Sequence, residues 1–389
     1  MPFIKRLIFG LATLIVVLEL VLLLFFAGSH SELEVVKELI TTKASVVQDV
    51  RSNVKERRQT QRPTQSPRIP AALIERKQKK ELIHISIVIC GSRKDEALTM
   101  LKSSILFTNR TLVFHILAES GLHDGLKSVL DHWPCVEGKQ VSYKIHPLKF
   151  PEGQKPDEWK KLFKPCAAQR LFLPDILTEV DSLIYMDIDT LFLSPVQWLW
   201  DQFSNFNSSQ LASMTPEGEV SATGWYNRFA RHPYYGKLGL NSGVMLMNLT
   251  RMRSFGWQEK ILPIYNKYRF DITWGDQDIL NILFHYHPEL VYVLSCEWNY
   301  RNDHCIYGNN CKTADTNGIY ILHGNRGVFT NNKQPVFRAV YEGIEDAKQA
   351  GGIKEAVNAL ERRLGSHRKG YCGKAVDALL KFPRQLSAS

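Results

Sequence analysis

Hydrophobic residues in the first part of the folded region fall into two near-continuous runs separated by a stretch with helical spacing. The runs at residues 82–90 and 112–118 are rich in β-branched and other apolar residues. Runs this short and this apolar are typical of strands that are buried on both faces. The intervening residues 95–107 suit a short helix, and a second helix is expected at about residues 121–132. Strands that alternate with helices predict an α/β fold with a mostly parallel sheet.

Further elements are predicted along the rest of the chain. An amphipathic pattern at residues 163–178 predicts a helix that leads into a strand at residues 181–186. Later strands are expected at residues 211–214, 243–248, 291–294 and 319–322. The pattern then becomes helical, with helices expected at residues 338–348, 353–364 and 374–381. We therefore predict an α/β domain at residues 82–340 and a C-terminal helical cap at residues 341–389.

An apolar run near the N-terminus predicts a membrane anchor. Residues 7–27 are interrupted only by Glu19, and 21 helical residues span the roughly 30 Å hydrocarbon core of a bilayer. Lys5 and Arg6 precede the run, which favours a cytosolic tail at residues 1–6 and a lumenal remainder, as in a type II protein. A cleaved signal peptide is the alternative, but the run is longer than the apolar core of such peptides.

The positive charge of the chain is concentrated next to this run. The formal net charge is +10, yet residues 51–80 contain ten Lys or Arg and only two Glu. This stretch belongs to residues 28–81, whose prolines and polar residues predict a solvated stem. Because the basic excess does not lie on a folded face, nucleic-acid binding is not expected. With 44% apolar and 11% aromatic residues, the rest of the chain can form a sizeable core.

Two further features fit the lumen of the Golgi or ER. Asn-x-Ser/Thr sequons, which permit N-glycosylation, occur at Asn109, Asn207 and Asn248. Seven cysteines are typical of an oxidising compartment, and four of them are Cys296, Cys305, Cys311 and Cys372. The sequence leaves their pairing open. A zinc site that uses His304 with Cys305 and Cys311 is the alternative, but its spacing matches no standard finger, so disulfides are favoured.

The clearest chemical signal is the acid pair Asp187-Ile188-Asp189. It ends an apolar strand, and the residues that follow it, 190–195, are again mostly apolar. Burying an unpaired carboxylate is unfavourable in free energy, so two acids in this setting require a partner. Carboxylate oxygens suit a hard divalent cation such as Mn²⁺ or Mg²⁺, which can in turn bridge a diphosphate. Solvated acids in a turn are the alternative reading.

Two more polar clusters lie next to predicted elements. Cys90, Gly91 and Ser92 end the first strand, at the edge where parallel sheets bind nucleotides, although an ordinary turn explains them equally well. Asp276 and Gln277 precede a predicted helix, where capping alone would explain one acid.

A third cluster follows the last predicted strand. His323 and Gly324 are followed by Arg326. An imidazole can complete a carboxylate metal site, and an arginine can bind a phosphate oxygen. A histidine that is merely packed is the alternative.

In this order, these motifs resemble glycosyltransferase family 8, the retaining enzymes with an Asp-x-Asp pair. The resemblance covers about residues 82–342. It is closer still to the glucoside xylosyltransferases of animals, on distinctive runs at residues 159–166, 169–174, 224–236 and 298–308. It implies a GT-A-like fold that binds a nucleotide sugar.

The resemblance also implies roles for individual residues. It assigns Mn²⁺ binding to Asp187, Asp189 and His323. It assigns contacts with the donor sugar to Arg170, Asn241, Asp276 and Gln277. The chain departs from the family after His323, where the usual Lys-Pro-Trp is missing. Arg326 and Lys333 therefore both remain candidates for the cation that binds phosphate, with Arg326 preferred.

The function implied by the resemblance is transfer of xylose from UDP-xylose to O-linked glucose on EGF-like repeats, such as those of Notch, in an α1,3 linkage. Same-face attack is favoured over a double displacement, for which Asp276 is the one candidate nucleophile. Candidates for the acceptor side are Trp225, Tyr226, Arg228 and Trp298. The alternatives are a family 8 transferase that uses UDP-glucose or UDP-galactose, and a membrane-tethered binding protein without turnover. A metal phosphodiesterase is disfavoured because no second acidic-histidine cluster is evident.

Overall fold

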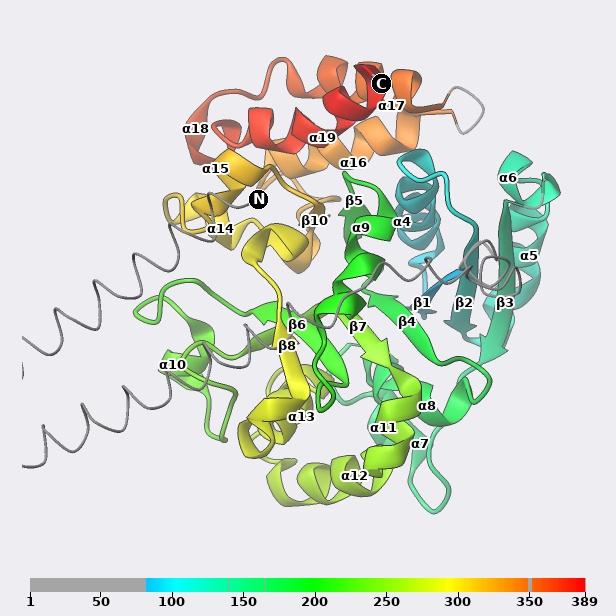
Figure 1. Ribbon diagram of the computed structural model, residues 1–389, viewed down its shortest axis with the longest axis vertical. Helices are drawn as coiled ribbons and strands as arrows, with labels where there is room; N and C mark the ends of the chain where they lie inside the picture. Colours follow the sequence, from blue (N-terminus) through cyan, green and yellow to red (C-terminus); the bar gives the residue numbers. More distant parts are fainter. Residues whose placement is uncertain (1–81, 139, 165, 349–351, 389) are drawn as a thin grey trace, which may run out of the picture. The chain divides into compact units, whose positions relative to one another are not determined.

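A seven-stranded sheet forms the centre of the computed structural model, which describes residues 82–388 apart from 139, 165 and 349–351 (Figure 1). The predicted tail at 1–6, anchor at 7–27 and stem at 28–81 lie outside the described residues. Within the described part of the chain, no helix has the length and apolar character needed to cross a bilayer.

The strand order of the sheet is β3-β2-β1-β4-β7-β6-β8. The strands are β1 (Ile83–Ile89), β2 (Leu112–Ala118), β3 (Val141–Pro147), β4 (Ser182–Met186), β6 (Ala212–Pro216), β7 (Leu240–Asn248) and β8 (Val291–Val293). All neighbouring pairs are parallel except the two that involve β7, which runs antiparallel to β4 and β6. The prediction of a mostly parallel sheet is confirmed.

A second, three-stranded sheet joins distant parts of the chain. It consists of β5 (Thr190–Phe192), β10 (Ile321–His323) and β9 (Tyr300–Arg301). In the antiparallel β5–β10 pair, His323 lies opposite Thr190. The pairing therefore carries the end of a late strand to the residue that follows the acid pair. Of these strands, the sequence pattern predicted only β10.

Helices cover both faces of the central sheet. The buried side chains form two hydrophobic clusters, one containing Ile85 and the other Tyr185. The longer helices are α4 (Lys94–Leu106), α12 (Trp257–Tyr268), α13 (Asp276–Tyr286), α16 (Pro335–Asp346), α17 (Gly352–Leu364) and α19 (Val376–Ala388). The shorter ones are η1 (Ser120–Leu122), α5 (His123–Leu130), α6 (Pro134–Glu137), α7 (Pro156–Lys160), α9 (Val196–Trp200), η3 (Asp201–Asn205), α10 (Trp225–Phe229), α11 (Leu249–Phe255), η4 (Pro288–Leu290), η5 (Cys296–Asn299), α14 (Asp303–Ile306), α15 (Thr313–Asn317), η6 (Asn325–Gly327) and α18 (Gly370–Gly373).

The C-terminal helices lie together, with α16, α17 and α19 coloured from orange to red in Figure 1. The boundary predicted between residues 340 and 341 falls inside α16. Side chains of α16 such as Phe337 and Ile344 share a hydrophobic cluster with Ile85 of β1. The C-terminal helices are therefore continuous with the core of the α/β region.

The prediction of one helix at residues 163–178 is wrong in its extent. The structure has a 3₁₀ helix, η2 (Ala167–Phe172), followed by the single turn α8 (Leu173–Ile176). Cys166, which precedes η2, has a φ of 63°, and an α-helix does not tolerate this angle. Pro174 has no backbone N–H to donate and therefore starts a new turn instead of continuing a longer helix.

Six of the seven cysteines form disulfides, which pair Cys90 with Cys166, Cys296 with Cys311 and Cys305 with Cys372. The seventh, Cys135, is buried. The preference for disulfides over a zinc site at His304 is thus confirmed, because both cysteines of that alternative are already bonded.

Three histidines of neighbouring strands stack on one another. The rings of His84, His115 and His146 come from β1, β2 and β3, and consecutive ring centroids lie 5.2 and 5.5 Å apart. Facing ring nitrogens are 2.9 and 3.3 Å apart. Burial, reinforced by the two flanking histidines and Lys144, lowers the pKa of His115 from 6.5 to about 3.

This histidine stack predicts acid sensitivity. Because the folded state disfavours the protonated ring, the stability linked to His115 is complete above pH 6.5 and is lost as the pH falls toward about 3. The free energy of unfolding should fall by about 1.4 kcal/mol per pH unit for this one proton. The free energy of unfolding, measured with urea between pH 7 and pH 5, should depend less steeply on pH in His115→Gln than in the wild type. The exposed control His132→Gln should keep the pH dependence of the wild type. Equal slopes in His115→Gln and the wild type would contradict the prediction.

Candidate functional site

A cavity of about 590 Å³ opens at the carboxyl ends of β1 and β4, the edge at which α/β sheets bind ligands. Most of the residues proposed from the sequence line it, namely Cys90, Gly91, Ser92, Arg170, Asp187, Ile188, Asp189, Asp276, Gln277 and Arg326.

The acid pair sits in a tight turn between β4 and β5. The N–H of Asp187 donates to the carbonyl of Gly243 (2.8 Å), and the hydroxyl of Thr190 donates to the carbonyl of Asp187 (2.6 Å). The Asp187 carboxylate accepts hydrogen bonds from Arg170 (2.8 Å) and from the hydroxyl of Tyr185 (3.1 Å). The turn thus fixes the position of a carboxylate at the cavity.

The structure brings Asp187, Asp189 and His323 together. One potential ligand atom from each lies within 4.8 Å of the other two, and His323 Nε2 is 3.3 Å from Asp189 Oδ1. The other oxygen, Asp189 Oδ2, is buried and has no hydrogen-bond partner within the described residues. A buried carboxylate oxygen without a donor, beside a second carboxylate and an imidazole, is a donor set that suits a hard divalent cation.

Positive charges also surround this cluster. Arg93 and Lys164 lie 3.6 and 3.8 Å from Asp189 Oδ2. Burial alone would raise the pKa of Asp189, but the hydrogen bond and charge of His323, together with these two cations, lower it well below its usual value. Asp189 therefore stays ionised at neutral pH.

A chain of hydrogen bonds fixes which nitrogen of His323 faces the acids. The backbone N–H of Gly243 donates to Asn241 Oδ1 (3.0 Å), which identifies that atom as an acceptor. Asn299 Nδ2 donates to the same oxygen (2.7 Å), so Asn299 Oδ1 must accept from His323 Nδ1–H (2.8 Å). When the ring is neutral, its lone pair therefore lies on Nε2, the same atom that faces Asp189 and donates to it when the ring is protonated.

This chain gives Asn241 a role that differs from the prediction. Its Nδ2 donates to Glu217 Oε2 (2.6 Å), and the side chain is not part of the cavity lining. The neighbouring Ser242 lines the cavity instead. Strand alternation accounts for the difference, because successive side chains of β7 point to opposite faces.

Arg170 is fixed between two carboxylates. It is 4% exposed and forms ion pairs with Asp187 and, through Nε, with Asp276 Oδ2 at 2.5 Å. Its guanidinium also lies 4.4 Å from the centre of the Tyr185 ring and donates to the carbonyl of Ser242. Burial alone would lower the pKa of Arg170, but the two acids raise it, so it remains a fixed cation in the cavity wall.

Asp276 and Gln277 begin α13 after a glycine. Gly275 has a φ of 61°, and a Cβ there would lie 2.5 Å from the Cβ of Phe163, so a larger residue does not fit. Burial raises the pKa of Asp276 to about 6, despite the opposing effect of Arg170. Gln277 Oε1 accepts from the N–H of Ser242 (3.1 Å), which orients its amide in the cavity wall.

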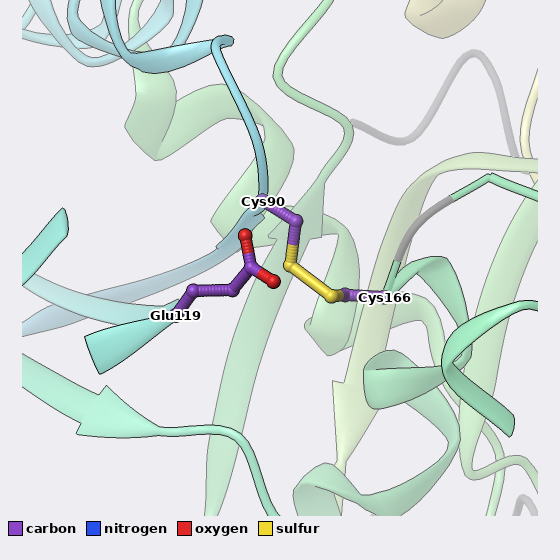
Figure 2. A group of neighbouring side chains, drawn as sticks. All are labelled: Cys90, Glu119 and Cys166. Carbon is purple, nitrogen blue, oxygen red and sulfur yellow. A yellow bond between two sulfur atoms is a disulfide. The ribbon is translucent and has the colours of Figure 1, made fainter. Parts of the chain in front are cut away.

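Cys90 forms a cross-link and offers no free thiol. Figure 2 shows its disulfide with Cys166, beside the carboxylate of Glu119. The N–H of Gly91 donates to Glu119 Oε2 (2.8 Å), and Lys160 pairs with Oε1 (2.6 Å). The end of β1 is thus tied to the start of η2, the element that carries Arg170.

The candidate residues after His323 have different positions. The N–H of Gly324 donates to the carbonyl of Asp189 (2.7 Å), so this glycine supports the acid pair from outside the cavity lining. Arg326 lines the cavity and forms an ion pair with Asp303 (2.9 Å), whereas Lys333 is exposed and outside the lining.

Sequence reasoning missed the cations Arg93 and Lys164. Arg93 directly follows the residues that end β1, so its position after a strand at the binding edge was an available signal. Lys164 lies in a loop whose approach to Asp189 depends on long-range folding.

The proposed acceptor-side residues separate into two groups. Trp225 and Arg228 line a second cavity. Tyr226 is 1% exposed and donates to Asp278 (2.8 Å), and Trp298 stacks on Tyr320 with ring centroids 4.1 Å apart. Tyr226 and Trp298 are therefore packing residues that an acceptor does not reach.

Comparisons with known proteins agree with this geometry. The model of the family "Glycosyl transferase family 8" matches residues 91–323. The chain is 45% identical to Glucoside xylosyltransferase 1 of Danio rerio, over 94% of this chain and 93% of that protein. It is 50% identical to Glucoside xylosyltransferase 1 of Homo sapiens, over 77% and 70%. The crystal structure of the glycosyltransferase GlyE from Streptococcus pneumoniae TIGR4 has a TM-score of 0.50 at 15% identity, covering 72% of this chain and 63% of that one. The GT-A-like fold is thereby confirmed.

Proposed function

Because the chain belongs to glycosyl transferase family 8, we propose that it transfers xylose from UDP-xylose to a glucoside with retention of configuration. The observation that carries the proposal is the convergence of Asp187, Asp189 and His323 beside a cavity whose volume suits a nucleotide sugar. Relatives at 45% and 50% identity that are named glucoside xylosyltransferases support xylose as the sugar and a glucoside as the acceptor.

We assign the three converging residues to Mn²⁺, with Mg²⁺ as the alternative. The ion would neutralise the negative charge that develops on the departing diphosphate. Arg93 and Lys164, close to Asp189, supply further positive charge for the phosphates, and Arg326 adds another cation to the lining. Arg170 cannot move toward the phosphates without leaving Asp187 and Asp276. We therefore assign it to orienting these two acids.

The geometry around Asp276 favours same-face attack. The carboxylate that would serve as nucleophile in a double displacement already pairs with Arg170 Nε at 2.5 Å. In the proposed step, the bond between the anomeric carbon and the diphosphate oxygen breaks on the face where the acceptor oxygen forms its new bond. The acceptor proton passes to the departing diphosphate oxygen. Asp276 and Gln277 then serve to hold sugar hydroxyls.

For the acceptor we propose O-linked glucose on EGF-like repeats, as in Notch, joined in an α1,3 linkage. The test is transfer from UDP-xylose to a glucosylated EGF repeat with Mn²⁺, and again with EDTA. Transfer that stops in EDTA and returns with Mn²⁺ is expected. Faster transfer from UDP-glucose or UDP-galactose would favour the alternative donors, and donor and acceptor binding without turnover of any UDP-sugar would favour a binding protein.

We also propose a Golgi or ER location, with residues 7–27 as the anchor and the described region in the lumen. The three disulfides support an oxidising compartment. Asn109 and Asn207 are exposed, whereas Asn248 caps α11 by accepting from the N–H of Arg251 (2.8 Å). Glycosidase-sensitive mass at Asn109 or Asn207, together with protease protection in intact microsomes, would test this assignment.

The raised pKa of Asp276 predicts a pH-dependent KM. As the pH falls through about 6, Asp276 takes up a proton and loses its charge toward Arg170 and the sugar hydroxyls. The KM for UDP-xylose should then rise about tenfold for each pH unit below 6. In Asp276→Asn the KM should be raised at all pH values and flat between pH 7 and pH 5. A wild-type KM that does not change over this interval would contradict the prediction.

A further inference from the structure

A second cavity of about 290 Å³ adjoins the first, and Arg326 lines both. Its walls come from the segment after β6, from α10 and from α14. The two cavities also meet through an aromatic pair, since Trp225 of the second packs edge-on against Trp274 of the first with centroids 5.4 Å apart. A molecule in the second cavity would therefore lie beside one in the first.

The polar part of this cavity includes, beside three basic side chains, three acids whose ionised carboxylates only accept hydrogen bonds. They are Glu217, Glu219 and Asp303. Of these, Asp303 is paired with Arg326, and Glu217 is engaged by Asn241. The remaining acid, Glu219, has a buried Oε1 atom without a hydrogen-bond partner among the described residues. A buried acceptor of this kind needs a hydrogen-bond donor, which a water or a ligand hydroxyl in the cavity would supply.

The basic groups of this cavity do not supply that donor. The closest, His304 Nε2, is 3.9 Å from Glu219 Oε1, beyond hydrogen-bond distance. Burial and the charge of Arg301 lower the pKa of His304 well below its usual value, so its ring is neutral at pH 7. Arg228 is exposed and lies over the Phe229 ring (4.6 Å).

The apolar part of the cavity is aromatic. The indole of Trp225 is half-buried, and Phe229 and Tyr307 are 52% and 62% exposed. Aromatic surface beside carboxylate acceptors matches a pyranose, which offers a face of C–H groups and a rim of hydroxyl donors. The same carboxylates repel a diphosphate, whereas the cations Arg93 and Lys164 line the first cavity.

We infer that the second cavity binds the neutral hexose of the acceptor glucoside, with Glu219 accepting from its hydroxyl groups and Trp225 packing against its C–H face. The inference rests on the proposed function, because it places the acceptor next to the donor sugar. It adds that Glu219 and Trp225 recognise the hexose without contributing to nucleotide binding, and that an anionic hexuronoside is rejected.

The experiment measures binding of methyl glucoside and methyl glucuronide to the full-length protein, saturated with UDP and Mn²⁺, by saturation-transfer NMR and calorimetry. Methyl glucoside should bind, and Glu219→Gln and Trp225→Leu should each weaken it at least about tenfold. The UDP affinity of both variants should stay at the wild-type value. The exposed control Glu289→Gln, on η4, should change neither affinity. Glu217 is left unchanged because it also contacts Asn241.

Several outcomes would overturn the inference. They are wild-type glucoside affinity in both variants, an equal loss of UDP affinity, or glucuronide binding as tight as glucoside binding. Because Glu219→Gln keeps the size of the side chain, it separates recognition from packing. If the wild type transfers xylose but the variants keep the wild-type acceptor KM, this inference fails and the proposed function stands. If the wild type binds glucoside but transfers no xylose, the proposed function fails and this inference stands.

Discussion

Asp189→Asn is expected to reduce xylose transfer by about 10³-fold, because the change removes a carboxylate from the cluster assigned to the cation. Stabilising the charge that develops on a leaving diphosphate is worth several kcal/mol, and each 1.36 kcal/mol corresponds to a tenfold change in rate. Asp189 is 2% exposed, and its unpartnered Oδ2 lies between Arg93 and Lys164. An amide at this position has the size of the carboxylate but lacks its charge. Initial rates with UDP-xylose and saturating Mn²⁺ measure the loss.

Controls separate this effect from misfolding. Asp201→Asn removes an exposed acid from η3 and should keep wild-type rates. Circular dichroism and the melting temperature of Asp189→Asn should remain close to the wild type, and its Mn²⁺ affinity, measured by electron paramagnetic resonance, should fall. Asp187→Asn should likewise lose transfer while it still folds. Wild-type turnover in either variant would remove the metal from the proposed function.

The sequence predicted the parts of the site that depend on local pattern. Apolar runs located β1, β2 and β4. Because a parallel sheet brings the carboxyl ends of such strands to one edge, the loop at Gly91 was expected at the nucleotide-binding edge, and the structure places the acid pair in the same cavity. The strand-end position of His323 marked it as a possible metal ligand, and the resemblance to family 8 assigned it to the same ion as Asp189, a link that no local pattern gives. In the structure, the antiparallel pairing of β5 with β10 provides this link.

Other parts required the folded chain. The prediction of a helix at residues 163–178 did not anticipate the left-handed backbone conformation of Cys166. The sequence does not reveal this conformation for a residue other than glycine. Asn241 was assigned to the sugar because its motif matches the family, but its side chain faces Glu217 and Asn299. Glu219 was not singled out from the sequence, and Asn299 was included only as part of the run at residues 298–308, because the importance of both arises from partners that are distant in the chain.

Asn299→Ala is expected to lower the affinity for Mn²⁺ by about 10- to 100-fold, although Asn299 would not touch the ion. Asn299 is fully buried and receives the Nδ1–H of His323, which holds the lone pair of the ring on Nε2. Without that acceptor, the ring is free to carry its proton on Nε2, and this tautomer has no lone pair on the nitrogen that faces the acid pair. Titration of Mn²⁺ in the presence of UDP, followed by electron paramagnetic resonance, measures the affinity. The ¹⁵N shifts of the His323 ring report the tautomer directly.

Two further variants distinguish this positioning role from a general loss of stability. Asn299→Asp keeps an acceptor for His323 Nδ1–H but cannot donate to Asn241 Oδ1, so it should recover most of the Mn²⁺ affinity while its melting temperature stays below the wild type. Asn281→Ala removes an equally buried asparagine that bonds to Leu240 and lies apart from the cluster. It should lower the melting temperature and leave Mn²⁺ affinity unchanged. If Asn281→Ala weakens Mn²⁺ as much as Asn299→Ala does, or if the Nδ1–H tautomer persists in Asn299→Ala, then packing and not hydrogen-bond direction orients His323.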